Sequence, residues 1–202
     1  MDIYLKKAIE MFPDASCELI YHNPFEFLSE VMLSAQTTDK KVNMVSIKLF
    51  EKFPTFDSVK ENDYDEIYEI IKPLGLANGK TSNFIKLCLE LQKRKTIPNN
   101  VADLVTLPGV GEKTAYVYMA EIYKEPHIAV DTHVSRVATR LGLSKEKDPL
   151  KISKDLEIRY PKELYIKVHH TFLFLGRYKC KSLKPDCDSC LLKDICQYKK
   201  SV

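Results

Sequence analysis

The sequence has no long hydrophobic run, no low-complexity segment and no strand-like alternation of residues. No stretch of its 202 residues approaches the roughly 20 consecutive apolar residues that span a bilayer. We therefore expect a soluble, intracellular protein with no membrane partner, in the cytoplasm or nucleoid if the source is bacterial or archaeal. Runs of alternating β-branched residues are missing, and nearly every segment has a helical period. The sequence predicts an all-α protein.

The expected helices are separated by short, proline-bearing turns. One helix begins after Asn23, which suits an N-cap, with Pro24 at its first position, and Asp39 opens the next. The remaining helical segments are expected at residues 63–71, 78–92, 100–106, 112–123, 131–141, 149–160 and 162–178.

Net charge alone does not identify a polyanionic partner. The chain has 31 basic and 28 acidic side chains, a formal net charge of +3. Its basic residues are concentrated near the C-terminus, where Arg177, Lys179, Lys181 and Lys184 lie close together in sequence. Such clustering suits contact with phosphates, although a solvated lysine-rich tail would show the same pattern.

Cysteine is scarce outside this basic segment. Four of the six cysteines follow one another as Cys180, Cys187, Cys190 and Cys196, in the spacing C-x6-C-x2-C-x5-C. Four thiols this close form a tetradentate metal site for zinc or an iron–sulfur cube. Two disulfides are the alternative, but they need an oxidising compartment, and the N-terminal segment has no apolar signal core. We therefore expect a metal, and the spacing leaves zinc and iron open.

A glycine-containing hairpin, L-P-G-V-G-E-K-T-A at residues 107–115, lies between two helical segments. Gly109 and Gly111 permit backbone angles closed to other residues and leave a surface that a phosphate can approach. The helix that begins at Glu112 directs its free N–H groups into the same space. A tight helical hairpin whose glycines serve only the turn is the alternative.

Three motifs in this order resemble the endonuclease III family of DNA glycosylases, within the helix-hairpin-helix superfamily of base-excision repair. They are the hairpin, the segment V-D-T-H-V-S-R-V at 130–137 and the cysteine tail. Two further segments extend the resemblance over nearly the whole chain: L-S-A-Q-T-T-D at 33–39 and L-G-L-A-N-G-K at 74–80. It implies a six-helix domain at residues 17–125, with the helix-hairpin-helix at about 100–123. The other domain would unite residues 1–16 and 126–202 around a [4Fe–4S] cluster held by the four cysteines, with zinc the minor alternative.

The resemblance also implies a catalytic pair, Lys113 and Asp131. A lysine amine can attack the sugar C1′, displace the base and leave a Schiff base that permits β-elimination. Asp131 would stabilise positive charge on the sugar and assist proton transfers, and it can also cap the next helix. His133 is expected to support the site rather than carry a proton. From the residues alone, Lys113 would be a phosphate-binding lysine.

Base removal inside a duplex requires extrusion of the nucleotide. Gln36 and Leu76 match the family residues that fill the resulting gap, although from the residues alone we would expect a helix-end hydrogen bonder and a core leucine. Ala77 and Glu112 depart from the family, whose members often have an aromatic and a basic residue there. The other expected DNA contacts are Gly109, Gly111, Thr114, Arg177, Lys179, Lys181 and Lys184.

The resulting expectation is a monomeric, bifunctional glycosylase and lyase that acts on oxidised or ring-saturated pyrimidines in damaged double-stranded DNA. Two other functions stay open. A monofunctional mismatch or adenine glycosylase is disfavoured because such relatives generally lack the lysine at position 113. A non-catalytic DNA-binding module would use the hairpin and the metal loop only to grip phosphates.

Overall fold

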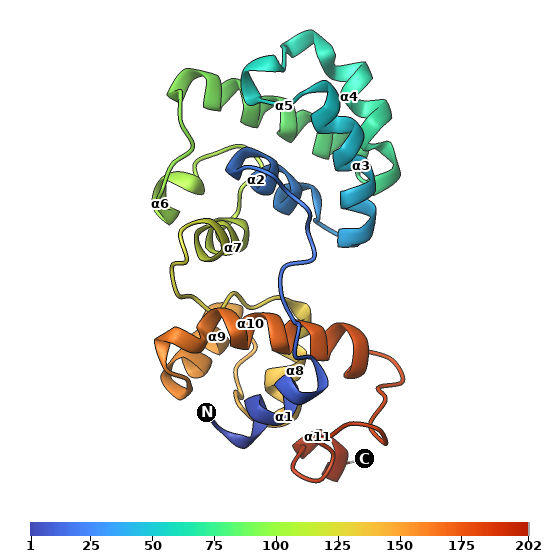
Figure 1. The fold of residues 1–202 in the computed structure, drawn as a ribbon, viewed down its shortest axis with the longest axis vertical. Coiled ribbons are helices and arrows are strands. Elements are labelled where there is room, and N and C mark those ends of the chain that lie inside the picture. Colours follow the sequence, from blue (N-terminus) through green and yellow to red (C-terminus); the bar gives the residue numbers. More distant parts are fainter. Residues whose placement is uncertain (202) are drawn as a thin grey trace. The chain divides into compact units, whose positions relative to one another are not determined.

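A computed structural model describes residues 1–201, and no strand occurs in that range. The all-α prediction is confirmed. The chain forms two compact units, one made of Glu18–Glu125 and the other of Met1–Cys17 with the chain from Pro126 onward (Figure 1). None of the helices within the described residues is long and apolar enough to cross a membrane.

The unit formed by Glu18–Glu125, here called the central unit, has six α-helices among its described residues. Short 3₁₀ turns join several of them, and α2 packs against α3, α5 and α7. The elements are α2 (Pro24–Leu33), α3 (Asp39–Lys52), η1 (Phe56–Ser58), η2 (Glu61–Asp63), α4 (Tyr64–Ile71), η3 (Lys72–Leu74), α5 (Ala77–Arg94), α6 (Val101–Leu104) and α7 (Glu112–Ile122).

Helix α2 is the buried centre of this unit. It begins as the sequence predicts, with the Asn23 side chain accepting a hydrogen bond from the amide of Glu26 at 3.0 Å and Pro24 at its first position. Phe27 and Leu28 are fully buried, and Phe25 packs its ring against Phe84 of α5. A helix covered on nearly every face by other helices can fix the positions of the segments that follow it.

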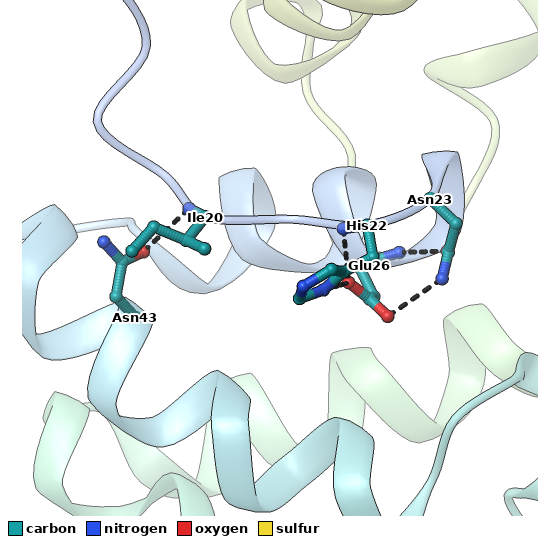
Figure 2. A network of polar contacts seen from close by, with 5 residues as sticks. All are labelled: Ile20, His22, Asn23, Glu26 and Asn43. Atoms are coloured by element: carbon teal, nitrogen blue, oxygen red, sulfur yellow. Dashed lines mark hydrogen bonds and ion pairs between the residues drawn. The ribbon is translucent and has the colours of Figure 1, made fainter.

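The irregular segment that enters the central unit is held by side chains of α2 and α3 (Figure 2). Glu26 accepts hydrogen bonds from the backbone amide of His22 at 2.6 Å and from the Asn23 side chain at 2.8 Å. Asn43 accepts one from the amide of Ile20 at 3.1 Å. The contacts to His22 and Ile20 satisfy main-chain amides that have no partner in a helix, so the segment is ordered without regular secondary structure.

The second unit, here called the terminal unit, combines both ends of the chain. In Figure 1, α1 lies beside α10, and Leu5 of α1 shares one core with Val134 of α8 and Phe172 of α10. Its elements are α1 (Ile3–Met11), α8 (Thr132–Leu141), α9 (Pro149–Arg159), η4 (Lys162–Leu164), α10 (Tyr165–Phe174), η5 (Leu175–Lys179) and α11 (Gln197–Ser201).

The single helix expected over residues 162–178 is divided in the structure. A 3₁₀ turn precedes α10, and η5 closes it as one turn of π-helix, with the amide of Cys180 donating to the carbonyl of Leu175 at 2.6 Å. Gly176 lies in this turn, and a Cβ there would come within 2.8 Å of the His133 Cβ. The π turn therefore brings the end of this helix against the start of α8, a tertiary contact that local periodicity cannot report.

Buried charge is present inside the central unit at Glu30 of α2, which is 0% exposed. Burial raises the pKa of Glu30 from 4.5 to about 7, against an opposing contribution from the Ser46 hydroxyl. The unfolded chain therefore loses its proton at a lower pH than the folded protein does. Stability should fall as the pH rises from the ordinary carboxyl range to about 7, and it should change little from this group above that.

Replacing Glu30 by Gln tests this dependence. The variant should gain stability relative to the parent, and the gain at about pH 8 should exceed the gain at about pH 5 by roughly 2 kcal/mol, because the amide has no charge to desolvate. Urea unfolding followed by circular dichroism at both pH values measures the difference. Glu51→Gln, at an exposed position of α3, is the matched control; an equal gain from Glu30→Gln at both pH values would contradict the interpretation.

Candidate functional site

The hairpin between α6 and α7 needs glycine at its first glycine position. Gly109 has a φ of +77°, and a Cβ there would lie 2.6 Å from the Met32 sulfur and 2.9 Å from the Asn83 Cβ. Leu107 and Val110 on either side are buried. The hairpin is therefore fixed against α2 and α5 by close backbone approach as well as by its apolar side chains.

The second glycine serves a different purpose. Gly111 has a φ of −90°, which any residue can adopt, so the expectation of a special backbone conformation is wrong at this position. It is the N-cap of α7, and a Cβ would meet no atom within 4 Å. No side chain in the described residues caps α7. The missing side chain keeps the first amides of the helix open to an anion, which is the arrangement expected of a phosphate site.

Lys113 lies at the second position of α7, one residue inside this open helix end, and it is exposed. Thr114 follows and is half-buried, and Glu112 precedes it as an exposed acidic residue of the first turn. The hairpin thus presents a primary amine directly beside backbone N–H groups. An amine and an anion site at one helix end can contact adjacent parts of a sugar–phosphate chain.

Gln36 and Leu76 share an unusual backbone conformation. Both are non-glycine residues with left-handed φ, 55° and 51°, and both are exposed. Leu76 is 61% exposed, so the alternative that it belongs to the core is wrong. Bulky residues adopt this conformation only where surrounding structure imposes it, and such positions are concentrated at binding sites.

In the terminal unit, Asp131 is the N-cap of α8, as the sequence analysis allows. Its Oδ1 accepts hydrogen bonds from the amides of His133 at 2.9 Å and Val134 at 2.8 Å. The cap fixes the carboxylate at the positive end of the helix. The Nδ1 atom of half-buried His133 lies 3.1 Å from the Arg136 guanidinium, so His133 contacts its own helix.

Two arginines of α8, for which the sequence predicts no role, hold the cysteine segment. Arg136 donates to the carbonyls of Gly176 at 2.8 Å and Cys180 at 2.9 Å. Arg140 donates to the carbonyl of Lys181 at 2.7 Å and to the Cys180 sulfur at 3.4 Å. Arg136 and Arg140 are four residues apart in the helix that begins after Asp131, so both lie on one helix face. This spacing is the sequence signal that could have indicated a shared partner.

The four cysteines line one small cavity, together with apolar side chains of α8 and η5. Burial raises the thiol pKa of Cys187 and Cys190, and the charges of neighbouring thiolates raise both further. Within residues 1–201, no three His, Cys, Asp or Glu side chains are arranged to hold one metal ion directly. The structure thus brings the four predicted ligands together around one cavity.

The basic residues near this cavity differ in their surroundings. Lys179 donates to the Asp186 carboxylate at 2.8 Å and to the Ser189 hydroxyl at 2.7 Å, which fixes the loop between the cysteines. The contact lowers the pKa of Asp186 to about 2. Lys181 and Lys184 are exposed and Arg177 is half-buried. Of the four, the two exposed lysines are the most accessible to a polyanion.

Comparison with known proteins agrees with these features. Residues 29–162 match the model of the HhH-GPD superfamily of base excision DNA repair proteins. Endonuclease III of Rickettsia felis is 41% identical over 98% of this chain and 95% of its own length, and that of Bacillus subtilis is 40% identical over 98% and 91%. The chain belongs to the endonuclease III family. It is accordingly a base-excision repair enzyme, a glycosylase and lyase that acts on damaged DNA.

Solved structures give the same result for the fold. A trapped endonuclease III–DNA covalent intermediate superposes with a TM-score of 0.91 at 42% identity, covering 98% of this chain and 94% of that one. A non-covalent endonuclease III–DNA complex gives a TM-score of 0.92. A thermostable thymine-DNA glycosylase is 20% identical with a TM-score of 0.85, which shows a shared fold alone.

Substitution of the two hairpin glycines should separate folding from binding. Gly109→Ala should destabilise the protein by about 2–4 kcal/mol, because it combines a left-handed backbone with a clash in packed surroundings. Gly111→Ala should leave the free energy of unfolding within about 1 kcal/mol of the parent but weaken DNA binding, because its methyl group lies at the open helix end. Urea unfolding and fluorescence anisotropy with duplex DNA measure both effects; equal destabilisation by the two substitutions would contradict the assignment.

Proposed function

We propose that this protein removes oxidised or ring-saturated pyrimidines from duplex DNA and cleaves the strand through a Schiff base on Lys113. The observation that carries the proposal is the exposed amine at the second position of α7, directly after the side-chain-free helix end at Gly111. This arrangement supports phosphate binding and nucleophilic attack by one short segment. The Rickettsia felis and Bacillus subtilis relatives, named endonuclease III, add their support.

In the proposed mechanism, the neutral amine of Lys113 attacks C1′ while the bond between C1′ and the base nitrogen breaks. The base leaves with its bonding electrons and takes up a proton, and opening of the sugar ring gives the Schiff base. Loss of a proton from C2′ then expels the 3′ phosphate by β-elimination. The attacking and leaving groups must be held in line, which the fixed hairpin favours.

Asp131 is assigned the electrostatic role. Its carboxylate is fixed by the amides of His133 and Val134, so it need not reorganise when positive charge develops on the sugar. It can also accept and return protons during ring opening. His133 supports the start of α8 through its contact with Arg136.

DNA binding is assigned to both units. Exposed Leu76 and Gln36 of the central unit would fill the gap left by the extruded nucleotide, and the open end of α7 with Gly109, Gly111 and Thr114 would contact phosphate. Lys181 and Lys184 of the terminal unit, supported by Arg177 and Lys179, would bind the backbone electrostatically. Because the substrate is duplex DNA, we place the activity in the compartment that holds the chromosome.

The cysteine-lined cavity fits a [4Fe–4S] cluster. Cys180, Cys187, Cys190 and Cys196 supply four thiols around one cavity, and four thiolates are the donor set that such a cluster takes. Burial raises the thiol pKa of Cys187 and Cys190, and a bound cationic centre would favour their ionised form. When bound, such a cluster cross-links four thiolates and can exchange an electron. The chain's own contribution is to hold the loop with Lys181 and Lys184 in a defined position.

Borohydride trapping tests the nucleophile. The purified protein, incubated with a duplex carrying one thymine glycol, should form a covalent adduct, and Lys113→Gln should reduce trapping about 100-fold or more because the amide is not nucleophilic. Lys48→Gln, at an exposed position of α3, is the matched control and should trap as the parent does.

Two other outcomes would contradict this proposal. Base release without an adduct, with strand cleavage only after alkali, would indicate a monofunctional glycosylase. Duplex binding with neither base release nor an adduct on an abasic-site duplex would indicate a DNA-binding module without catalysis.

Removal of one thiol tests the metal centre. Cys187→Ser should lower bound iron and visible absorbance and should weaken DNA binding about tenfold, because the loop with Lys181 and Lys184 loses its cross-link. Iron analysis and anisotropy with duplex DNA measure both quantities. Cys17→Ser, outside the cavity, should change neither. Full iron content in the Cys187 variant would contradict the assignment, and zinc in place of iron would favour the minor alternative.

A further inference from the structure

A second lysine of the central unit, Lys80 of α5, is buried. Its residue is only 6% exposed, and burial lowers the pKa of its ammonium group. Its Nζ donates to the carbonyl of Leu74 at 3.1 Å. An ammonium group in such surroundings costs free energy that an apolar side chain would not. The carbonyl that the ammonium binds belongs to the turn before α5, so the buried lysine stabilises that turn.

Both donor groups of Lys80 bind the same short segment. The backbone amide donates to the carbonyl of Leu76 at 3.0 Å, and the ammonium donates to the carbonyl of Leu74, two residues earlier. Leu74 is itself buried, so one end of the segment is fixed in the core. The bond to Leu76 is the ordinary i→i−4 bond of the first turn of α5, so the bond from the ammonium to Leu74 is the contact that depends on the lysine side chain.

Between these two carbonyls the backbone is unusual at consecutive residues. Gly75 has a φ of 73°, and Leu76 follows with a φ of 51° and a ψ of 33°. A leucine in this conformation persists only where neighbouring contacts outweigh its strain. Leu76 is also 61% exposed, although an apolar side chain gains free energy by leaving water. Strain and exposure both favour relaxation of the turn, and the Lys80 contacts oppose it.

We propose that Lys80 is a positioning residue that holds Leu74–Leu76 in the conformation in which Leu76 enters the DNA stack. The inference rests on the proposed role of Leu76 and adds the residue that maintains it. Lys80 acts through the backbone of the turn, since its ammonium group is buried and bonded to a carbonyl. Lys113, which is exposed, is the amine that meets the sugar.

The test substitutes Lys80 by Met, which keeps the length of the side chain and removes its charge and donors. Single-turnover excision of thymine glycol from a matched duplex should fall about tenfold, the equivalent of one net hydrogen bond. Borohydride trapping on a single-stranded abasic oligonucleotide, which has no stack to fill, should stay within about twofold of the parent. The melting temperature should change little, because removal of the buried charge offsets the loss of the donor to the Leu74 carbonyl.

Three further variants complete the experiment. Leu76→Ala should show the same selective loss on the matched duplex, and combining it with Lys80→Met should add little, because both changes act on one element. Lys86→Met, at an exposed position of the same helix, should behave as the parent. Lys80→Arg, which retains a charged donor, should recover part of the lost rate.

The outcomes distinguish this inference from the function on which it rests. Normal excision by Lys80→Met beside impaired excision by Leu76→Ala would overturn the positioning role and leave the role of Leu76 intact. Equal losses on the duplex and the single strand would also overturn it, since they would indicate general damage. If Leu76→Ala excises as the parent does, the proposed role of Leu76 fails, and the positioning role fails with it.

Discussion

The terminal unit depends on hydrogen bonds from two arginines of α8 to backbone carbonyls of an irregular loop. Arg136 and Arg140 donate to carbonyls from Gly176 to Ser182, in a stretch where the chain leaves regular helix and its carbonyls lose their helical partners. A planar guanidinium can bind two such acceptors in fixed geometry, which a lysine cannot do. The same helix begins at Asp131. The capped carboxylate and the cysteine loop are therefore held by one rigid element, so a disturbance of the loop should reach the start of α8.

In the central unit, left-handed backbone conformations occur where DNA contacts are proposed and also at Lys95 and Lys124, just after α5 and α7. Gln36, Gly75, Leu76 and Gly109 all have left-handed φ, and each lies in a segment next to a helix that packs in the core. Buried α2 makes this possible, because its packing against α3, α5 and α7 fixes the ends of the intervening segments. A rigid scaffold with strained, exposed connections is the usual way to present binding residues.

Local signals in the sequence predict where helices begin. The features that the sequence does not predict depend on contacts between residues far apart in the chain. Asn23 with Pro24 predicts the start of α2, and Asp131 suits a cap of α8, because both features act within one helical turn. The partners of Arg136 and Arg140 lie about 40 residues away in sequence, and no local pattern identifies them. At Gly111 the sequence predicts a special backbone conformation that the structure does not have. Its position resembles that of a turn glycine, but its φ of −90° is ordinary.

Two buried charged side chains in the central unit illustrate how stability and function separate. Glu30 is enclosed in α2, and burial raises the pKa of its carboxyl to about 7. Lys80 is also buried, but its ammonium is bonded to the turn that carries Leu76. Both arrangements lower stability relative to an apolar core. The side chain of Lys80 bonds the turn of strained, exposed Leu76, and the proposed positioning role would account for the cost of burying its charge. Burial of a charged side chain therefore does not by itself indicate function. A hydrogen bond from that side chain to a strained, exposed segment is the more informative observation.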